Sequence, residues 1–169
     1  KILTLARDRF GEKPLYYGWV NNNFVFASEI KAIKKIKNFN NPICKHALNQ
    51  YLKVNYVPSP LSIYKNIFKL NPGSYIEINQ STNQTDYLKH KKFWSLDDKI
   101  KEKKFSIIND ENLILEELER KLIQSVKSQM LSDVPLGGFL SGGVDSSLII
   151  ALMQKENIKP TKTFTIGFE

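Results

Sequence analysis

The sequence predicts an α/β protein built from two parts that differ in strand arrangement. Residues 1–79 contain short apolar runs that alternate with polar positions, which predicts antiparallel strands. Residues 80–109 are dominated by Lys, Asp, Asn, Gln, Ser and Thr, as expected for a linker. Residues 110–169 contain a helix, a strand, a glycine loop, a second helix and a second strand, the order that begins a parallel sheet.

In the first part, the runs "KILTLARD", "LYYGWV" and "NNNFVFAS" each predict a strand, and together they predict a β-meander. Residues 29–36 place isoleucines at helical spacing, so we expect a short helix capped by Ser28. A second helix is expected over residues 45–54. The run "KLNPGSYIEI" predicts a turn and then a strand, with Ile76 and Ile78 on the face opposite Tyr75 and Glu77.

In the second part, residues 110–131 give the strongest helical pattern. One stripe is expected to face the core: Leu115, Leu118, Leu122, Val126 and Met130. Glu116 with Arg120, and Glu117 with Lys121, are spaced for ion pairs along this helix. The strand-like run "VPLGGFL", a helix over residues 144–156 and the strand-like run "KTFTIGF" complete the pattern.

Composition narrows the range of partners. The net charge of +8, from 25 Lys and Arg against 17 Asp and Glu, raises nucleic acid as a candidate, but the basic clusters contain acids or lie on helix faces, so we expect none. The single cysteine, Cys44, cannot form an internal disulfide, which fits a cytoplasmic location. No apolar run approaches the roughly 20 residues of a membrane span. We read the start "KILTLARD" and the end "TIGFE" as those of a fragment cut from a longer chain.

The run "GGFLSGGVDSSLII" predicts an anion site where a strand passes into a helix. Free backbone N–H groups and the positive end of the helix dipole meet at such a point. Gly142 and Gly143 allow a sharp turn and a close approach to a ligand. Hydroxyl groups are supplied by Ser141, Ser146 and Ser147. Val144 and Asp145 stand where a Walker A loop requires its lysine, so that motif is excluded.

Asp145 has two interpretations at this stage. A carboxylate repels phosphate, but it fits if Mg²⁺ lies between the acid and the phosphate oxygens. The alternative is that Asp145 only caps the helix.

The run "LSGGVDSS", residues 140–147, resembles the pyrophosphate loop of the ATP pyrophosphatases, which adenylate a carboxylate or carbonyl oxygen and release pyrophosphate. The positions that match are Ser141, Gly142, Gly143, Asp145 and Ser146. The resemblance implies that this loop, with Ser147, binds the pyrophosphate part of ATP and that Asp145 contributes to Mg²⁺ binding. It also implies that main-chain groups at Leu140 and Ile166 meet the adenosine.

The first part resembles a different family. "LARDRFGEKPLYYG" followed by "FASEIKAI" is similar to the later strands of class II glutamine amidotransferases, an α+β fold with an N-terminal nucleophile. Within these runs we expect Arg7 and Asp8 to form a structural ion pair. The family's nucleophile is an N-terminal cysteine with a free α-amino group. Cys44 lies inside a predicted helical region and is expected only to pack, so no catalytic residue is assigned and no glutamine hydrolysis is expected from this chain.

An amidotransferase domain followed by a pyrophosphatase loop is the order found in glutamine-hydrolysing asparagine synthetases. The resemblance implies a ligase that uses ATP and Mg²⁺ to transfer ammonia from glutamine to aspartate through β-aspartyl-AMP. It leaves room for a homodimer. Two alternatives stay open: a relative that amidates another carboxylate, in a surface polysaccharide or a secondary metabolite, and an RNA-binding protein that adenylates a tRNA base.

Overall fold

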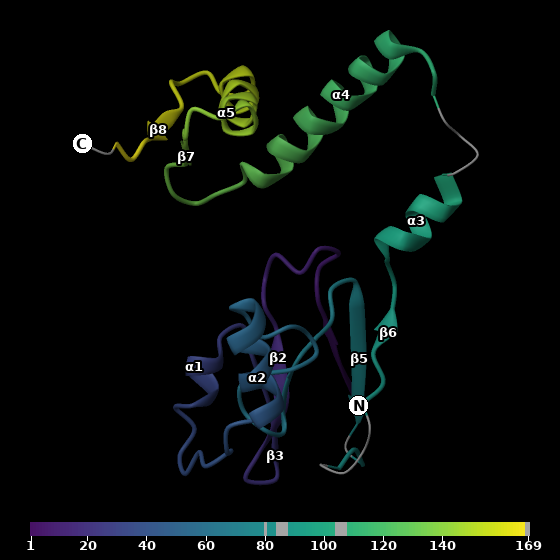
Figure 1. The fold of residues 1–169 in the computed structure, drawn as a ribbon, viewed down its shortest axis with the longest axis vertical. Coiled ribbons are helices and arrows are strands. Elements are labelled where there is room, and N and C mark those ends of the chain that lie inside the picture. Colours follow the sequence, from purple (N-terminus) through teal and green to yellow (C-terminus); the bar gives the residue numbers. More distant parts are fainter. Residues whose placement is uncertain (80, 84–87, 104–107, 168–169) are drawn as a thin grey trace. The chain divides into compact units, whose positions relative to one another are not determined.

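The computed structural model describes residues 1–79, 81–83, 88–103 and 108–167 as two compact units, Lys1–Lys104 and Phe105–Glu169 (Figure 1). Each unit is treated by itself. Residues 80, 84–87 and 104–107 of the predicted linker lie outside the described residues, while its described part includes β6 (Lys91–Lys92) and α3 (Leu96–Lys103). None of the helices in these ranges is both long and apolar enough to cross a membrane.

The first unit contains two antiparallel sheets. In one, the strand order is β1 (Ile2–Ala6), β5 (Ser74–Asn79) and β6; in the other, it is β3 (Asn23–Ala27), β2 (Tyr16–Val20) and β4 (Ile67–Lys69). The predicted strands and their antiparallel pairing are confirmed. The predicted β-meander is wrong, because β1 pairs with β5 and not with β2.

The connection from β1 to β2 is held by hydrogen bonds from the side chains of Arg7 and Asp8. The Arg7 guanidinium donates to the carbonyl oxygens of Leu70 and Gly11, both at 2.7 Å, and of Lys13 at 2.9 Å. The Asp8 carboxylate accepts from the backbone N–H groups of Phe10, Glu12 and Lys13. Both residues are structural, but they bind backbone groups and do not form the expected ion pair with each other.

The hairpin between β2 and β3 closes through the Asn-rich turn that the sequence predicts. Val20 pairs with Asn23, so Asn21 and Asn22 form a two-residue loop. Their φ angles are 49° and 63°. A tight hairpin turn of the I′ type needs positive φ at both central residues, and asparagine tolerates this conformation better than most residues.

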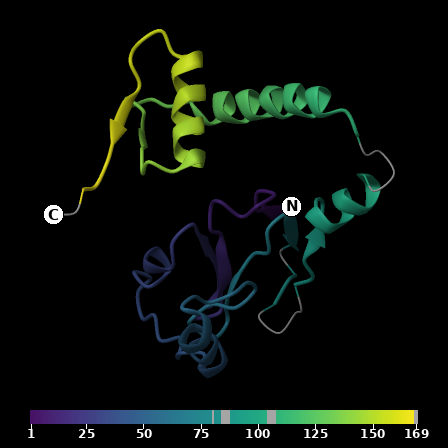
Figure 2. The ribbon, with the colours of Figure 1, turned by 45° about the horizontal axis from the view of Figure 1, so that its top comes forward.

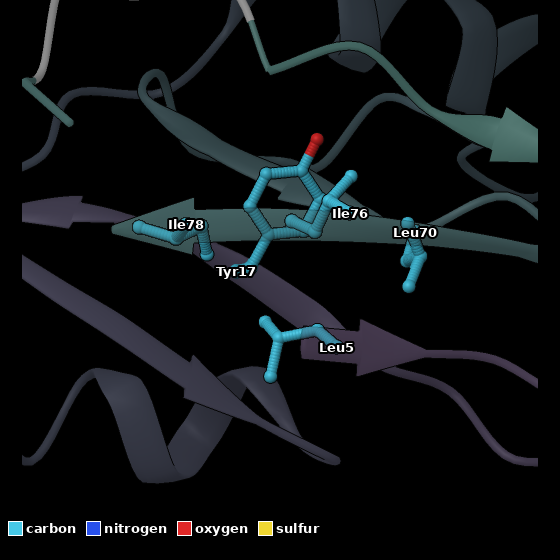
Figure 3. Close-up of a cluster of buried hydrophobic side chains, with 5 residues drawn as sticks. All are labelled: Leu5, Tyr17, Leu70, Ile76 and Ile78. Atoms are coloured by element: carbon cyan, nitrogen blue, oxygen red, sulfur yellow. The ribbon is translucent and has the colours of Figure 1, made fainter. Parts of the chain in front are cut away.

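The main core lies between the two sheets (Figure 3). Its buried members are Leu5, Tyr17, Leu70, Ile76 and Ile78. Ile76 and Ile78 are buried while Glu77 is exposed, which confirms the predicted faces of β5. A second cluster of Val20, Ile33 and Ile67 places α1 (Ile30–Ile33) against the opposite face of the β2 sheet. The unit is therefore sheet on sheet with a helix outside.

The helices of this unit agree in part with the sequence. The structure has α2 at Lys45–Val54, as predicted, and Asn55 ends it with a φ of 60°. The first predicted helix, residues 29–36, is one turn long as α1 and continues only as turns. Ser28 does not cap it; Glu29 occupies the N-cap position without a side-chain hydrogen bond. With no side-chain cap and a short apolar face, the helix has little to extend it.

His90 lies half-buried beside the core residue Tyr17. The Tyr17 hydroxyl oxygen and His90 Nε2 are 2.7 Å apart. The other ring nitrogen, Nδ1, is buried and makes no hydrogen bond to the residues that the structure describes. Burial lowers the pKa of His90 from its ordinary value, because the charged ring would lose hydration.

We expect the first unit to lose stability as the pH falls from about 7.5 to about 5.5. The unfolded chain, with a histidine pKa of about 6.5, takes up the proton before the folded unit does. The stability that the neutral ring contributes is present above the unfolded pKa. It is lost as the pH falls from the unfolded pKa to the lower pKa of the folded unit, with a slope of at most about 1.4 kcal/mol per pH unit. Urea unfolding followed by tryptophan fluorescence measures this, because Trp19 and Trp94 both lie in this unit.

A pair of histidine variants provides the control for this pH dependence. His90→Gln is expected to flatten the slope, and the same change at the exposed His46 is the matched control for the loss of a histidine. An unchanged slope in His90→Gln would assign the pH dependence to other groups.

The second unit begins with α4 (Glu111–Gln129) and continues through β7 (Gly137–Phe139), α5 (Val144–Glu156) and β8 (Lys162–Phe164). Figure 2 shows this strand, helix, strand order at the green and yellow end of the ribbon. β7 and β8 pair in parallel, with Phe139 opposite Phe164. The predicted helices and the parallel pair are confirmed. Asp110 caps α4 by accepting from the N–H groups of Asn112 and Leu113.

The predicted apolar stripe of α4 is only half used. Val126 is buried and packs with Leu152 and Met153 of α5, whereas Leu115 and Leu118 are 55% and 50% exposed. The apolar contact with α5 is made by the C-terminal half of α4, which leaves the N-terminal half of the stripe uncovered.

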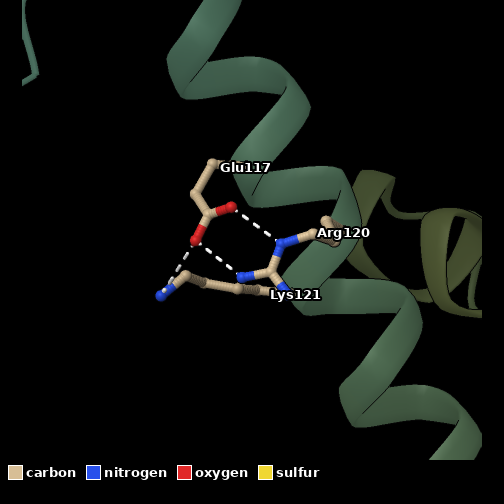
Figure 4. Close-up of polar contacts among 3 residues, drawn as sticks. All are labelled: Glu117, Arg120 and Lys121. Carbon is tan, nitrogen blue, oxygen red and sulfur yellow. Dashed lines mark hydrogen bonds and ion pairs between the residues drawn. The ribbon is translucent and has the colours of Figure 1, made fainter.

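The ion pairs on α4 differ from the prediction at one residue. Glu117 pairs with Lys121 at 3.4 Å, as expected, but Arg120 also binds Glu117, through two nitrogens at 2.8 Å, and not Glu116 (Figure 4). The hydrogen bonds from Arg120 lower the pKa of Glu117 to about 2. The bidentate geometry of the guanidinium favours this partner.

Candidate functional site

The glycine loop, residues 140–143, connects the end of β7 to the start of α5. The Leu140 N–H donates to the Phe164 carbonyl at 2.9 Å, which continues the parallel pairing one step beyond the strands. Ile166 follows β8. Because parallel strands end at the same sheet edge, the loop and Ile166 both follow the carboxyl ends of β7 and β8, where α/β sheets bind ligands.

The backbone of the loop is open on its outer side. Gly142 has a φ of +82°, and a Cβ built on it would meet no atom within 4 Å. Gly143 is the N-cap of α5, and the first intrahelical bond runs from Ser147 N–H to the Gly143 carbonyl at 3.1 Å. The N–H groups of Val144, Asp145 and Ser146 therefore have no intrahelical acceptor. These free donors, together with the helix dipole, suit an anion.

The three predicted serine hydroxyls are engaged with the loop itself. Ser146 and Ser147 donate to the Gly143 carbonyl at 3.1 and 2.9 Å. The Ser141 and Ser146 oxygens are 3.0 Å apart. Either oxygen of this pair can be the donor. The three hydroxyl groups thus hold the loop in this structure, and they lie beside the free backbone N–H groups at the start of α5.

Asp145 does not cap the helix. It lies in the first turn of α5, Gly143 holds the N-cap position, and the Asp145 carboxylate is exposed and accepts none of the hydrogen bonds found among the described residues. The capping interpretation is therefore excluded for this structure. An exposed carboxylate is a ligand that Mg²⁺ takes together with phosphate oxygens. The free N–H groups beside Asp145 could bind other oxygens of the same phosphates.

The residues that surround Asp145 could not hold a metal ion by themselves. The structure contains, within its described ranges, no group of three or more His, Cys, Asp or Glu side chains placed for a metal. A Mg²⁺ ion at Asp145 would therefore take its other ligands from phosphate oxygens and water, as this ion usually does.

The two residues expected near adenosine differ in environment. Leu140 is half-buried, while Ile166 is 77% exposed, so core packing does not occupy the Ile166 side chain. The structure adds a residue that the sequence did not single out. The Thr165 hydroxyl donates to the Leu140 carbonyl at 2.7 Å. Its only signal in the sequence is a polar residue at the end of an apolar strand.

Cys44 has a structural position in the first unit. It is the half-buried N-cap residue of α2, and its N–H donates to the Ile63 carbonyl at 2.8 Å. Its backbone nitrogen is part of the chain, so it lacks the free α-amino group that activates an N-terminal nucleophile. The prediction that Cys44 only packs therefore agrees with its position at the N-cap of α2.

The two units correspond to two known families. The glutamine amidotransferase domain matches residues 1–94, and asparagine synthase matches residues 117–169. The class is thus an amidotransferase domain followed by a synthase domain. The chain belongs to the family of glutamine-hydrolysing asparagine synthetases.

Three relatives illustrate the similarity. Over 99% of its length the chain is 37% identical both to a Methanocaldococcus jannaschii protein assigned as glutamine-hydrolysing asparagine synthetase 2 and to glutamine-hydrolysing asparagine synthetase 1 of Bacillus subtilis. It is 33% identical over 96% of its length to the second Bacillus subtilis synthetase. The chain spans 32%, 25% and 22% of the lengths of these three relatives.

Proposed function

We propose that the full-length protein containing this chain is an ATP-dependent asparagine synthetase that transfers ammonia derived from glutamine to aspartate. The observation that carries the proposal is the open loop between β7 and α5, where free N–H groups and the exposed Asp145 carboxylate both lie in the first turn of the helix. The amidotransferase match over residues 1–94 supports glutamine as the nitrogen donor. A protein that adenylates a tRNA base has no need of that domain.

The proposed reaction has two steps. An oxygen of the aspartate β-carboxylate attacks the α-phosphorus of ATP, and the bond from this phosphorus to the oxygen bridging to the β-phosphate breaks. Pyrophosphate leaves and β-aspartyl-AMP remains. Ammonia then attacks the acyl carbon, loses a proton and displaces AMP, which gives asparagine. The chain described here contributes to the first step, in which negative charge builds on the leaving pyrophosphate.

Each loop residue has a stated role in this proposal. The N–H groups at the start of α5 bind pyrophosphate oxygens and stabilise the charge that develops on them. The backbone of Gly142 and Gly143 allows the phosphates to approach, and Ser141, Ser146 and Ser147 hold the loop in shape. Asp145 would hold Mg²⁺, which neutralises phosphate charge when bound. Leu140 and Ile166 are proposed to meet the adenosine through their main chains.

The domain arrangement belongs to the same proposal. Residues 1–79 form most of the later part of the amidotransferase domain, and residues 80–109 form a link in which β6 still pairs with β5 of that domain. Residues 110–169 begin the ATP-pyrophosphatase domain. The partners are small molecules, namely glutamine, aspartate and ATP, with neither nucleic acid nor membrane required, and the enzyme acts in the cytoplasm. Subunit association as a homodimer is compatible with these roles.

The proposal is tested by measuring pyrophosphate release from the full-length protein with ATP, Mg²⁺ and glutamine. We expect release to depend on aspartate and to be matched by asparagine formation. If pyrophosphate release does not depend on aspartate but depends on another carboxylate, the proposed role of the loop stands and the acceptor is that other carboxylate. The protein would then be a relative that amidates it. If none of the carboxylates tested triggers pyrophosphate release, the ligase proposal is overturned.

A further inference from the structure

Leu140 is the first residue of the glycine loop, and both of its main-chain polar groups are bound by Phe164, the last residue of β8, and by Thr165, which follows it. Its N–H donates to the Phe164 carbonyl at 2.9 Å, and its carbonyl accepts from the Thr165 hydroxyl at 2.7 Å. The first bond is ordinary parallel pairing. The second is a side-chain contact across 25 residues, and it fixes the peptide that joins Leu140 to Ser141.

The loop has few other anchors at this end. Ser141, Gly142 and Gly143 are exposed, and no atom lies within 4 Å of a Cβ built on Gly142. Its other end is tied to α5 through the Gly143 carbonyl, which accepts from Ser146, Ser147 and the first helical N–H. The start of the loop is therefore held by the two bonds to Leu140 and by the contact between the Ser141 and Ser146 hydroxyl groups, whose oxygens are 3.0 Å apart.

We propose that Thr165 is a positioning residue for the pyrophosphate loop, acting through the Leu140 carbonyl. This inference rests on the proposed function. Thr165 donates its single hydroxyl proton to Leu140, so it has none to offer a ligand and acts only through the loop. Loop N–H groups that must meet developing charge need fixed placement.

Two substitutions at Thr165 separate the hydroxyl from the rest of the side chain. Thr165→Val keeps the shape and removes the donor, while Thr165→Ser keeps the donor and removes a methyl group. Thr163→Val is the matched control, since Thr163 is an exposed residue of β8 whose hydroxyl makes no hydrogen bond found among the described residues. The variants are made in the full-length protein.

The expected result is a loss of turnover more than of binding. In Thr165→Val, kcat for pyrophosphate release should fall about tenfold while the KM for ATP changes less than about threefold. Thr165→Ser and Thr163→Val should stay within about twofold of the wild type. A merely stabilising role would lower the melting temperature and leave kcat per folded enzyme unchanged.

A second measurement is independent of turnover. Calorimetric titration with Mg²⁺ and inorganic pyrophosphate should show about fivefold weaker binding to Thr165→Val than to the wild type and to Thr163→Val. Equal kcat and equal pyrophosphate affinity in Thr165→Val and wild type would overturn the inference and leave the proposed function intact. So would equal losses in Thr165→Ser, which would assign the effect to the methyl group, or in Thr163→Val, which would assign it to the strand.

These measurements also distinguish failure of the proposed function. If the wild type binds pyrophosphate but releases none from ATP with any carboxylate, the ligase proposal fails and the titration still tests the role of Thr165. If the wild type neither binds pyrophosphate nor releases it, both the proposed function and the inference about Thr165 are overturned.

Discussion

Asp145→Asn is expected to reduce pyrophosphate release by the full-length protein at least about a hundredfold. The substitution preserves size and removes the charge that the proposed Mg²⁺ ion requires. Asparagine caps a helix as well as aspartate does. If Asp145 served only the helix, the variant would keep both its activity and its melting temperature. In the structure the carboxylate is exposed and Gly143 holds the cap position, so we expect the melting temperature alone to be kept.

The control for Asp145→Asn is the same loss of one charge elsewhere in the second unit. Glu116→Gln serves for this, because Glu116 is exposed on α4 and forms none of the ion pairs found there. Its pyrophosphate release should stay within about twofold of the wild type. If pyrophosphate release by Asp145→Asn were also less than about threefold below that of the wild type at every Mg²⁺ concentration, the carboxylate would have no part in binding the metal.

The sequence was most informative where chemistry is local. The bounds of α2 and the two-asparagine turn depend on residues a few positions apart, and the structure has both of them. The glycine loop is also local: a strand, two glycines and a helix start suffice to leave N–H groups free. The structure then showed what the pattern left open, namely that Asp145 is not the cap.

Contacts between distant segments could not be read in the same way. β1 looked like the first strand of a meander because its partner, β5, lies far along the chain, and nothing in its own residues names that partner. Leu115 and Leu118 have the spacing of core residues, but exposure depends on what packs against them. Thr165 is informative only once β7 and β8 are paired, since its target is a main-chain carbonyl.

The fold of the first unit depends on Gly18, the last residue of the run "LARDRFGEKPLYYG". Gly18 lies in β2, the central strand between β3 and β4, opposite Val25 and Ile67. A Cβ at Gly18 would lie 2.0 Å from the Asn66 carbonyl oxygen and 2.8 Å from the Ile67 Cα. Both are backbone atoms, so no side-chain rotation can relieve the overlap.

We therefore expect Gly18→Ala to destabilise the first unit by at least about 3 kcal/mol. Relief requires β4 to move away from β2, which breaks the bond from Trp19 N–H to the Asn66 carbonyl at 2.9 Å and opens the core around Tyr17. Urea unfolding followed by tryptophan fluorescence measures the loss. Ala6→Val, a larger change at an exposed position of β1, should stay within about 0.5 kcal/mol of the wild type. Equal stability of Gly18→Ala and Ala6→Val would mean that β2 and β4 are not held as closely as the structure has them, because a backbone clash of this size cannot be absorbed by strands that keep their register.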